Sequence, residues 1–154
     1  MVREDGARLE KMEETTRRTP GASLKGVFLK AAAGMLEDNG RGEVVAEALG
    51  HLQQGFDSHH AAPNGATDDN ILVGDNAYAR AVETIAHLNE PRFVAVASRM
   101  IQDGAGRVAA GEDVTLELWT PHLAGLLDVI SGEGPERCEA RIREASGKAR
   151  GRDG

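Results

Sequence analysis

The residues best suited to bind a metal ion lie between positions 57 and 69: Asp57, His59, His60, Asp68 and Asp69. Carboxylate oxygens and imidazole nitrogens are common ligands of divalent cations. Adjacent histidines point in different directions, however, and no further carboxylate follows Asp69 one helical turn later. We therefore interpret His59 and His60 as loop residues. We interpret Asp68 and Asp69 as a solvated turn at the start of a helix, where carboxylates complement the helix dipole. A small hydrolase or metal-binding protein built on these five residues is kept as an alternative hypothesis.

Three further features invite a chemical interpretation but have a simpler one. Gly104 and Gly106 look like part of a phosphate-binding loop, yet they fall inside a helical pattern without the preceding strand that such a loop needs. We expect these small residues to let another helix approach closely. Trp119, the single tryptophan, is expected to anchor a core or an interface. Cys138 is the single cysteine, so the sequence predicts neither an intrachain disulfide nor a thiolate metal site.

Helical periodicity predicts the elements that must position these residues. Apolar side chains recur at three- and four-residue steps over residues 24–36, 43–56, 71–88, 91–108 and 114–130, where Pro121 interrupts the last segment. We expect Asn89 to cap the helix near Pro91, and Thr120 to cap a helix that starts at Pro121. The sequence thus predicts an all-α, single-domain antiparallel helical bundle over residues 19–130. Residues 1–18 are expected to form an N-terminal helix or a frayed end, and residues 131–154 a charged, largely disordered tail.

The amino-acid composition excludes several classes of function. Hydrophobic residues make up 40% of the 154 residues but aromatic residues only 3%, so the core must be built mainly from Ala, Leu and Val. The 18 basic and 25 acidic residues give a net charge of −7, which argues against a nucleic-acid partner because counterion release needs a positive surface. The first residues are charged, and no stretch approaches the roughly 20 apolar residues of a membrane span. We therefore expect a cytoplasmic protein.

An ordered set of short motifs runs from Ile71 to Glu112. Gly74-Asp75 precedes a run of small residues around Tyr78, an Asn-Glu-Pro turn ends at Pro91, and Gly111-Glu112 follows the next helix. This order resembles the middle of a trans-polyprenyl diphosphate synthase, in which a Gly-Asp pair opens one core helix and a Gly-Glu pair ends the next. The likeness spans residues 19–112. The chain resembles a degenerate, truncated member of this family, similar to the small non-catalytic subunit of heterodimeric hexaprenyl or heptaprenyl diphosphate synthase. This resemblance implies the N-terminal part of the isoprenoid synthase fold.

The resemblance implies a set of phosphate- and magnesium-binding motifs that can be sought in this chain. In the family, two aspartate-rich motifs bind the Mg²⁺ ions that hold the leaving diphosphate, and a Gly-Lys-Arg segment helps to bind the second diphosphate. The first motif should fall at residues 56–60, where Asp57 is the single carboxylate, and the basic segment should fall at residues 21–26, where the Lys-Arg pair is replaced. The second motif should lie well beyond Glu112, where Asp128 alone cannot replace it. We therefore expect no catalytic residue and no metal site in this chain, with Mg²⁺ bound by the partner subunit.

The resemblance further implies a regulatory subunit that pairs with the catalytic large subunit of the synthase, as a heterodimer or heterotetramer. In such a complex it helps to set the length of the isoprenoid product, typically the side chain of a respiratory quinone such as menaquinone. Self-association is also kept open. The residues expected to affect product length are Leu52, Gln53 and Phe56. The residues expected at the subunit interface are Tyr78, Ala81, Val82, Ile85, Phe93, Val94, Ala97 and Ile101. The alternative hypothesis is an independent helical protein-interaction or adaptor module without a catalytic role.

Overall fold

The computed structural model describes residues 23–35, 40–60 and 68–147, apart from the side chains of His60, Asp68 and Asn70. Within these residues the chain forms helices and no strand, which confirms the predicted all-α bundle. The helices are α2 (Leu24–Ala31), α3 (Arg41–His60), α4 (Asp68–Ala86), α5 (Pro91–Ala109), α6 (Leu116–Ser131) and α7 (Pro135–Ala145). None of them is long and apolar enough to cross a membrane. Residues 1–18, predicted to form a helix or a frayed end, lie outside the described part of the chain.

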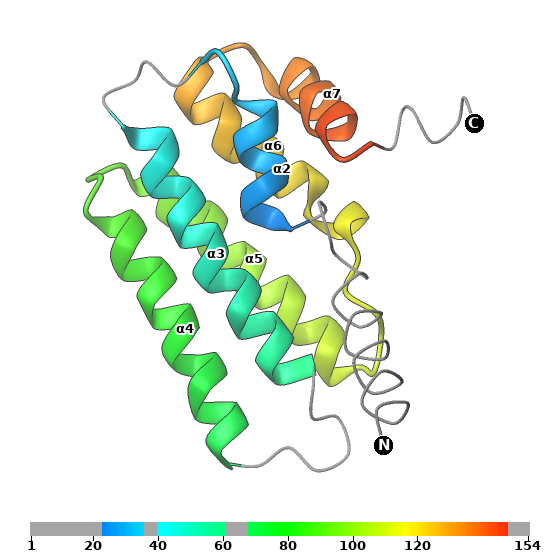
Figure 1. Ribbon diagram of the computed structural model, residues 1–154. Coiled ribbons are helices and arrows are strands. Elements are labelled where there is room, and N and C mark those ends of the chain that lie inside the picture. Colours follow the sequence, from blue (N-terminus) through cyan, green and yellow to red (C-terminus); the bar gives the residue numbers. More distant parts are fainter. Residues whose placement is uncertain (1–22, 36–39, 61–67, 148–154) are drawn as a thin grey trace, which may run out of the picture.

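Helices α3, α4 and α5 run up and down in antiparallel order, and the most extensive contact joins α3 to α4 (Figure 1). Helices α2 and α6 pack on α3, and α7 lies across one end of the bundle against α2 and α6. The core is largely aliphatic, as the composition predicts, with Leu49, Leu52, Ile85 and Met100 fully buried. Each of these residues lies on the apolar stripe of its helix, so burial of that stripe is what holds the helices together.

The helix bounds differ from the prediction at several ends, most of all in α2 and α3, while α4 begins at Asp68 rather than Ile71. Helix α2 ends at Ala31 rather than Leu36, and Gly34 follows with a φ of +87°, a conformation that glycine adopts without strain. Helix α3 continues beyond Phe56 to His60. The expectation that His59 and His60 lie in a loop is therefore wrong. Both belong to the last turn of α3, where Asp57 faces solvent and His59 faces α4, so polar residues continue the helix.

The turn between α4 and α5 has the predicted proline but a different cap. Pro91 is the first residue of α5, where its missing N–H needs no partner. The N-cap is Glu90 rather than Asn89, and its carboxylate accepts a hydrogen bond from the backbone N–H of Arg92. The Arg92 side chain bonds the same carboxylate, and together these contacts lower the pKa of Glu90 to about 2. Asn89 instead takes the left-handed conformation, with a φ of +55°, that reverses the chain.

Helix α6 is continuous through Pro121, which corrects the expectation of a helix that starts there. The helix begins at Leu116 after Thr115, and Pro121 lies inside it. Proline has no backbone N–H to donate at this point. The hydroxyl group of Thr120 donates to the carbonyl of Leu116, four residues earlier, so Thr120 bonds within α6 rather than capping a new helix.

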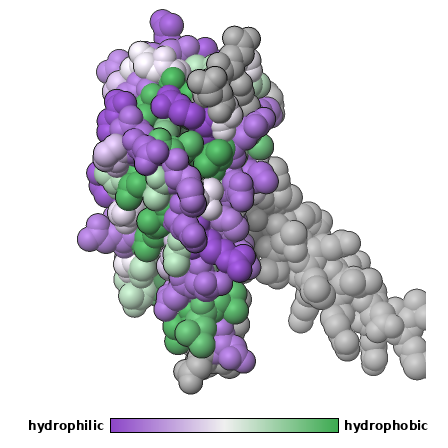
Figure 2. All heavy atoms as spheres, turned by 90° about the vertical axis from the view of Figure 1, so that its left-hand side faces the viewer, coloured by the Kyte–Doolittle hydropathy of each residue, from purple (hydrophilic) through white to green (hydrophobic). Residues whose placement is uncertain are grey.

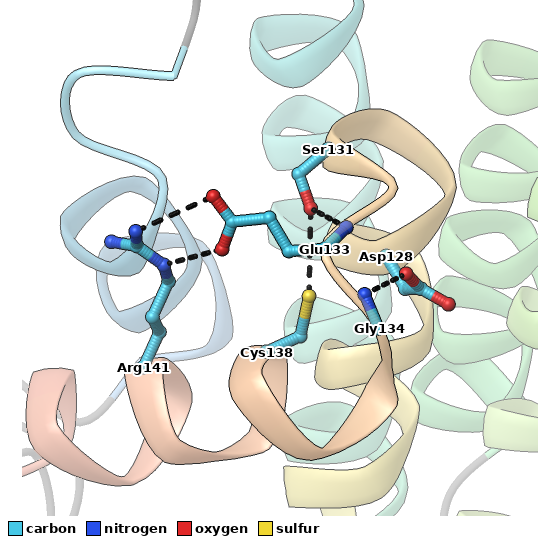
Figure 3. A network of polar contacts seen from close by, with 6 residues as sticks. All are labelled: Asp128, Ser131, Glu133, Gly134, Cys138 and Arg141. Atoms are coloured by element: carbon cyan, nitrogen blue, oxygen red, sulfur yellow. Dashed lines mark hydrogen bonds and ion pairs between the residues drawn. The ribbon is translucent and has the colours of Figure 1, made fainter.

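Helix α7 shows that the expectation of a disordered tail is wrong for residues 135–145. Cys138 and Ile142 are fully buried, so α7 contributes to the core. Its start is fixed by Asp128 of α6, whose carboxylate accepts a 2.8 Å hydrogen bond from the N–H of Gly134 (Figure 3). Arg141 also pairs with Glu133 at 3.0 Å in the connecting loop. Helix α7 thus buries one apolar face among charged residues, and the helix is too short for this face to give a clear periodic pattern in the sequence. Residues 148–154 lie outside the described part.

Candidate functional site

An aromatic cluster joins α3, α4 and α6 near the end of α3. Phe56 stacks on Trp119 with ring centroids 4.6 Å apart and planes inclined by 16°, and Tyr78 packs against Phe56 at 5.4 Å. Gly104 of α5 lies against the same rings, and a Cβ added there would come within 2.8 Å of Trp119. Trp119 is therefore a core anchor. Gly104 makes room for these rings from neighbouring helices and has no part in a phosphate-binding loop.

His59 connects this cluster to the surface through three polar contacts. Its Nδ1 atom lies 3.3 Å from the Tyr78 hydroxyl group, and its Nε2 atom lies 3.4 Å from both the Ile71 carbonyl and the Asp75 carboxylate. The carbonyl and the carboxylate can only accept, so Nε2 must carry the proton. In the neutral ring Nδ1 then accepts from Tyr78. Asp75, His59 and Tyr78 thus form a short chain of hydrogen-bonding groups between α3 and α4.

Two glycines allow α3 and α4 to approach closely at this point. A Cβ at Gly55 would collide with the Tyr78 ring, and a Cβ at Gly74 would collide with the His59 ring and come within 3.2 Å of the Gly55 carbonyl. Gly74 is the first residue of the Gly-Asp pair on which the resemblance rests. Its role in this structure is to admit the His59 ring, and the following Asp75 side chain then reaches the same ring.

The chemistry open to the Asp75–His59–Tyr78 chain is limited by burial. Burial, with a smaller contribution from the Asp75 carboxylate, raises the pKa of Tyr78 to about 12. A phenol with this pKa keeps its proton at neutral pH, so Tyr78 serves His59 as a donor and is a poor general acid or base. We interpret the three residues as a polar contact that stabilises the packing of α3 on α4.

The residues considered as metal ligands do not converge where the structure describes their side chains. Asp57 faces solvent and accepts a 3.3 Å hydrogen bond from the Gln53 side chain, while Asp69 is exposed near the start of α4, as predicted for a solvated turn. His59 is engaged with α4, and the side chains of His60 and Asp68 are outside the described part of the chain. Among the described residues, no group of three or more His, Cys, Asp or Glu side chains is arranged to hold a metal ion.

The start of α2, where the resemblance would put a diphosphate-binding segment, is capped by uncharged side chains of this chain. The Ser23 hydroxyl oxygen accepts from the N–H of Gly26 at 3.1 Å. The Gln53 side-chain oxygen, from α3, accepts from the N–H of Leu24 at 3.0 Å. Backbone N–H groups at a helix N-terminus are the groups that would bind an anion. Two of them already have partners: the N-cap residue Ser23 and, from α3, Gln53.

The three residues predicted to affect product length lie inside this chain. Leu52 is fully buried and Phe56 is 3% exposed, and Gln53 is half-buried, where it caps α2. A hydrocarbon could reach Leu52 or Phe56 only after the surrounding helices had moved apart. The prediction of a role in product length therefore requires rearrangement of this core.

The predicted interface residues divide into two groups. Five of them are covered by the chain's own helices: Tyr78, Ala81, Ile85, Phe93 and Ala97. The other three, Val82, Val94 and Ile101, are partly exposed. The apolar stripes of α4 and α5 thus pack mainly within one chain, and in this conformation only the second group is able to contact a partner. For that group the interface stays a prediction.

One polar contact between helices had no counterpart in the sequence analysis. His122 of α6 lies 2.8 Å from the carboxylate of Asp103 in α5, and its ring is 6.2 Å from that of Trp119. The two residues are 19 positions apart and belong to no shared motif, so only the packing of α5 on α6 brings them together. The Asp103 carboxylate is half exposed, so this pair also links the aromatic cluster to solvent.

No protein-family model, curated protein or solved structure matches the chain. Any functional assignment therefore rests on the residues of this chain and on the resemblance that they carry.

Proposed function

We propose that the chain is the non-catalytic small subunit of a heteromeric trans-polyprenyl diphosphate synthase. In this role it binds the catalytic subunit, stabilises it and helps to set the length of the isoprenoid product. The observation that carries the proposal is the position of the resembling motifs: Gly74-Asp75 lies at the close contact of α3 with α4, and the Asn-Glu-Pro turn joins α4 to α5. The residues that resemble the family are thus residues on which the packing of this fold depends.

The capped start of α2 supports a role without catalysis. A subunit that binds a diphosphate there needs free backbone N–H groups and cationic side chains. Gln53 and Ser23 instead satisfy the N–H groups of Leu24 and Gly26, and the nearby Lys25 is exposed to solvent. Opening this site would break two hydrogen bonds before any ligand bound.

The end of α3 does not fit the magnesium ions that the family uses. Mg²⁺ requires several hard oxygen ligands in octahedral arrangement. Asp57 offers one carboxylate, which is exposed and bonded to Gln53, and His59 in the same turn is packed on α4. We therefore assign the binding of Mg²⁺ to the catalytic subunit, and no step of prenyl transfer to this chain.

The proposal is tested by a prenyl-transfer assay with three samples: this chain, the full-length synthase subunit from the same organism, and their mixture. Each sample receives an allylic diphosphate, radiolabelled isopentenyl diphosphate and Mg²⁺, and incorporation into extractable product is measured. We expect no turnover by this chain alone and a higher rate or a longer product in the mixture. Turnover by the pure chain would refute the non-catalytic role. A mixture identical to the catalytic subunit alone would refute the subunit assignment and favour an independent adaptor.

A further inference from the structure

One helical turn near the start of α4 exposes apolar side chains on successive residues. Leu72 is 64% exposed, Val73 45% and Ile71 42%, and these are the large apolar side chains that the described residues leave open to solvent. Figure 2, which faces α4, shows the hydrophobic patch at the lower end of the molecule, where α4 begins in Figure 1. Three successive exposed positions span more than half of the helix circumference, at 100° per residue. We refer to Ile71, Leu72 and Val73 as the apolar turn.

The central residue of the apolar turn does not continue the internal stripe of α4. Gly74 is buried against α3, and Ala77, Tyr78 and Ala81 continue that inward face. At 100° per residue Leu72 lies nearly opposite this face, with Ile71 and Val73 on either side of it, and the described residues leave all three side chains exposed. Such a patch on a water-exposed helix end commonly marks a contact with another protein.

The charges around the apolar turn indicate the kind of partner. Asp69 precedes it and is exposed, and Asp75 follows it with a side chain that is 62% exposed. The whole chain carries a net charge of −7. A second copy would bring the same two carboxylates against each other, which like-charge repulsion disfavours. A groove that is apolar at its centre and lined by Lys or Arg at its edge complements both features.

We infer that the apolar turn inserts into an apolar, basic-edged groove on the catalytic subunit of the synthase. This inference rests on the proposed function for the identity of the partner. Leu72, the most exposed of the three residues, is the central contact, and Asp69 and Asp75 meet the basic edge. The interface thus begins near the start of α4, and the partly exposed Val82 lies farther along the same helix.

Binding of the wild-type chain and of Leu72→Glu to the purified catalytic subunit, measured by calorimetry, tests the inference. Burial of a leucine side chain at the centre of an interface typically changes affinity by about tenfold to a hundredfold, and we expect a loss of at least about tenfold. The matched control is Ala140→Glu, which adds the same charge to an exposed position of α7, a helix without contacts to α4 among the described residues, and should bind like the wild type. Circular dichroism of both variants verifies that the helices remain folded.

A photoreactive amino acid at position 72 reports the contact directly. We expect cross-links to the catalytic subunit, on a peptide rich in Lys or Arg. The change Asp69→Lys should slow association and weaken its dependence on salt, whereas Asp113→Lys, an exposed change after α5, should do neither.

The failures of the two proposals are distinguishable. If the wild-type chain binds the catalytic subunit and Leu72→Glu binds equally well, the inference is wrong and the proposed function stands. If the wild-type chain does not bind the catalytic subunit at all, the proposed function is wrong, and the catalytic subunit is not the partner of the apolar turn. Cross-links from position 72 to another part of the same chain, or to a second copy in a dimer that Leu72→Glu dissociates, would show a different occupant and overturn the inference.

Discussion

Replacing Gly104 by alanine adds one methyl group at the point where α5 meets the rings of Phe56 and Trp119. The added Cβ would lie 2.5 Å from Phe56 Cε1 and 2.8 Å from Trp119 Cη2, closer than real Cβ atoms approach their neighbours. Alanine gains about 1 kcal/mol over glycine from helix propensity. Forcing a methyl group into a packed core typically costs about 1–3 kcal/mol. The free energy of unfolding should therefore stay the same or fall by up to about 2 kcal/mol.

The matched control is two residues away in the same helix. A Cβ added at Gly106 would meet nothing within 4 Å, so Gly106→Ala should raise the free energy of unfolding by up to about 1 kcal/mol. Urea denaturation followed by circular dichroism measures both variants, which should differ by about 1–3 kcal/mol. If Gly104→Ala were as stabilising as Gly106→Ala, the rings of Phe56 and Trp119 would not be packed against α5 as described.

Three further predictions address other contacts. Tyr78 is the single tyrosine, so tyrosinate absorbance should titrate with a pKa of about 12 in the folded chain. Because folding raises this pKa from 10.0, the neutral phenol contributes to stability below pH 10, and that contribution is lost as the pH rises toward 12. A titration midpoint near 10 in the folded chain would contradict the burial of Tyr78. Burial also raises the pKa of the Cys138 thiol, so a thiol reagent should label Cys138 slowly in the folded chain and quickly in denaturant. The change Asp128→Ala removes the hydrogen bond at the start of α7 and should therefore speed labelling of the folded chain. Gln53→Ala should lower the free energy of unfolding by roughly 1 kcal/mol through loss of the α2 cap, whereas the exposed Gln54→Ala should leave it nearly unchanged.

The sequence predicted those features that depend on local patterns. The apolar stripes of α4 and α5 recur over several turns, and Pro91 marks the start of α5, so both helices and the turn between them follow from periodicity and from the chemistry of proline. The aliphatic core follows from the low aromatic content. The burial of Trp119 follows from the size of its apolar side chain. The sequence did not predict that Trp119 stacks on Phe56.

The features that the sequence analysis missed depend on contacts between distant residues. Helix α7 was assigned to a tail because its composition is charged, but Cys138 and Ile142 find their apolar surroundings on α2 and α6. The cap from Gln53 to the start of α2 joins residues 29 positions apart. Neither contact leaves a periodic signal. The apolar turn was missed for another reason, because the sequence analysis grouped the apolar residues of 71–88 in one helix without separating Leu72, which helical periodicity places nearly opposite the stripe of Tyr78 and Ala81.

The product of the reconstituted synthase tests the central claim most directly. The catalytic subunit is assayed alone and with this chain, and the chain length of the product is measured by chromatography. A non-catalytic subunit that helps to set product length predicts a longer or narrower distribution in the presence of this chain. Because a hydrocarbon can reach Phe56 only after the surrounding helices have moved apart, a shift of that distribution with Phe56→Ala would show in addition that this core rearranges in the complex. Identical product distributions with and without this chain would contradict the account.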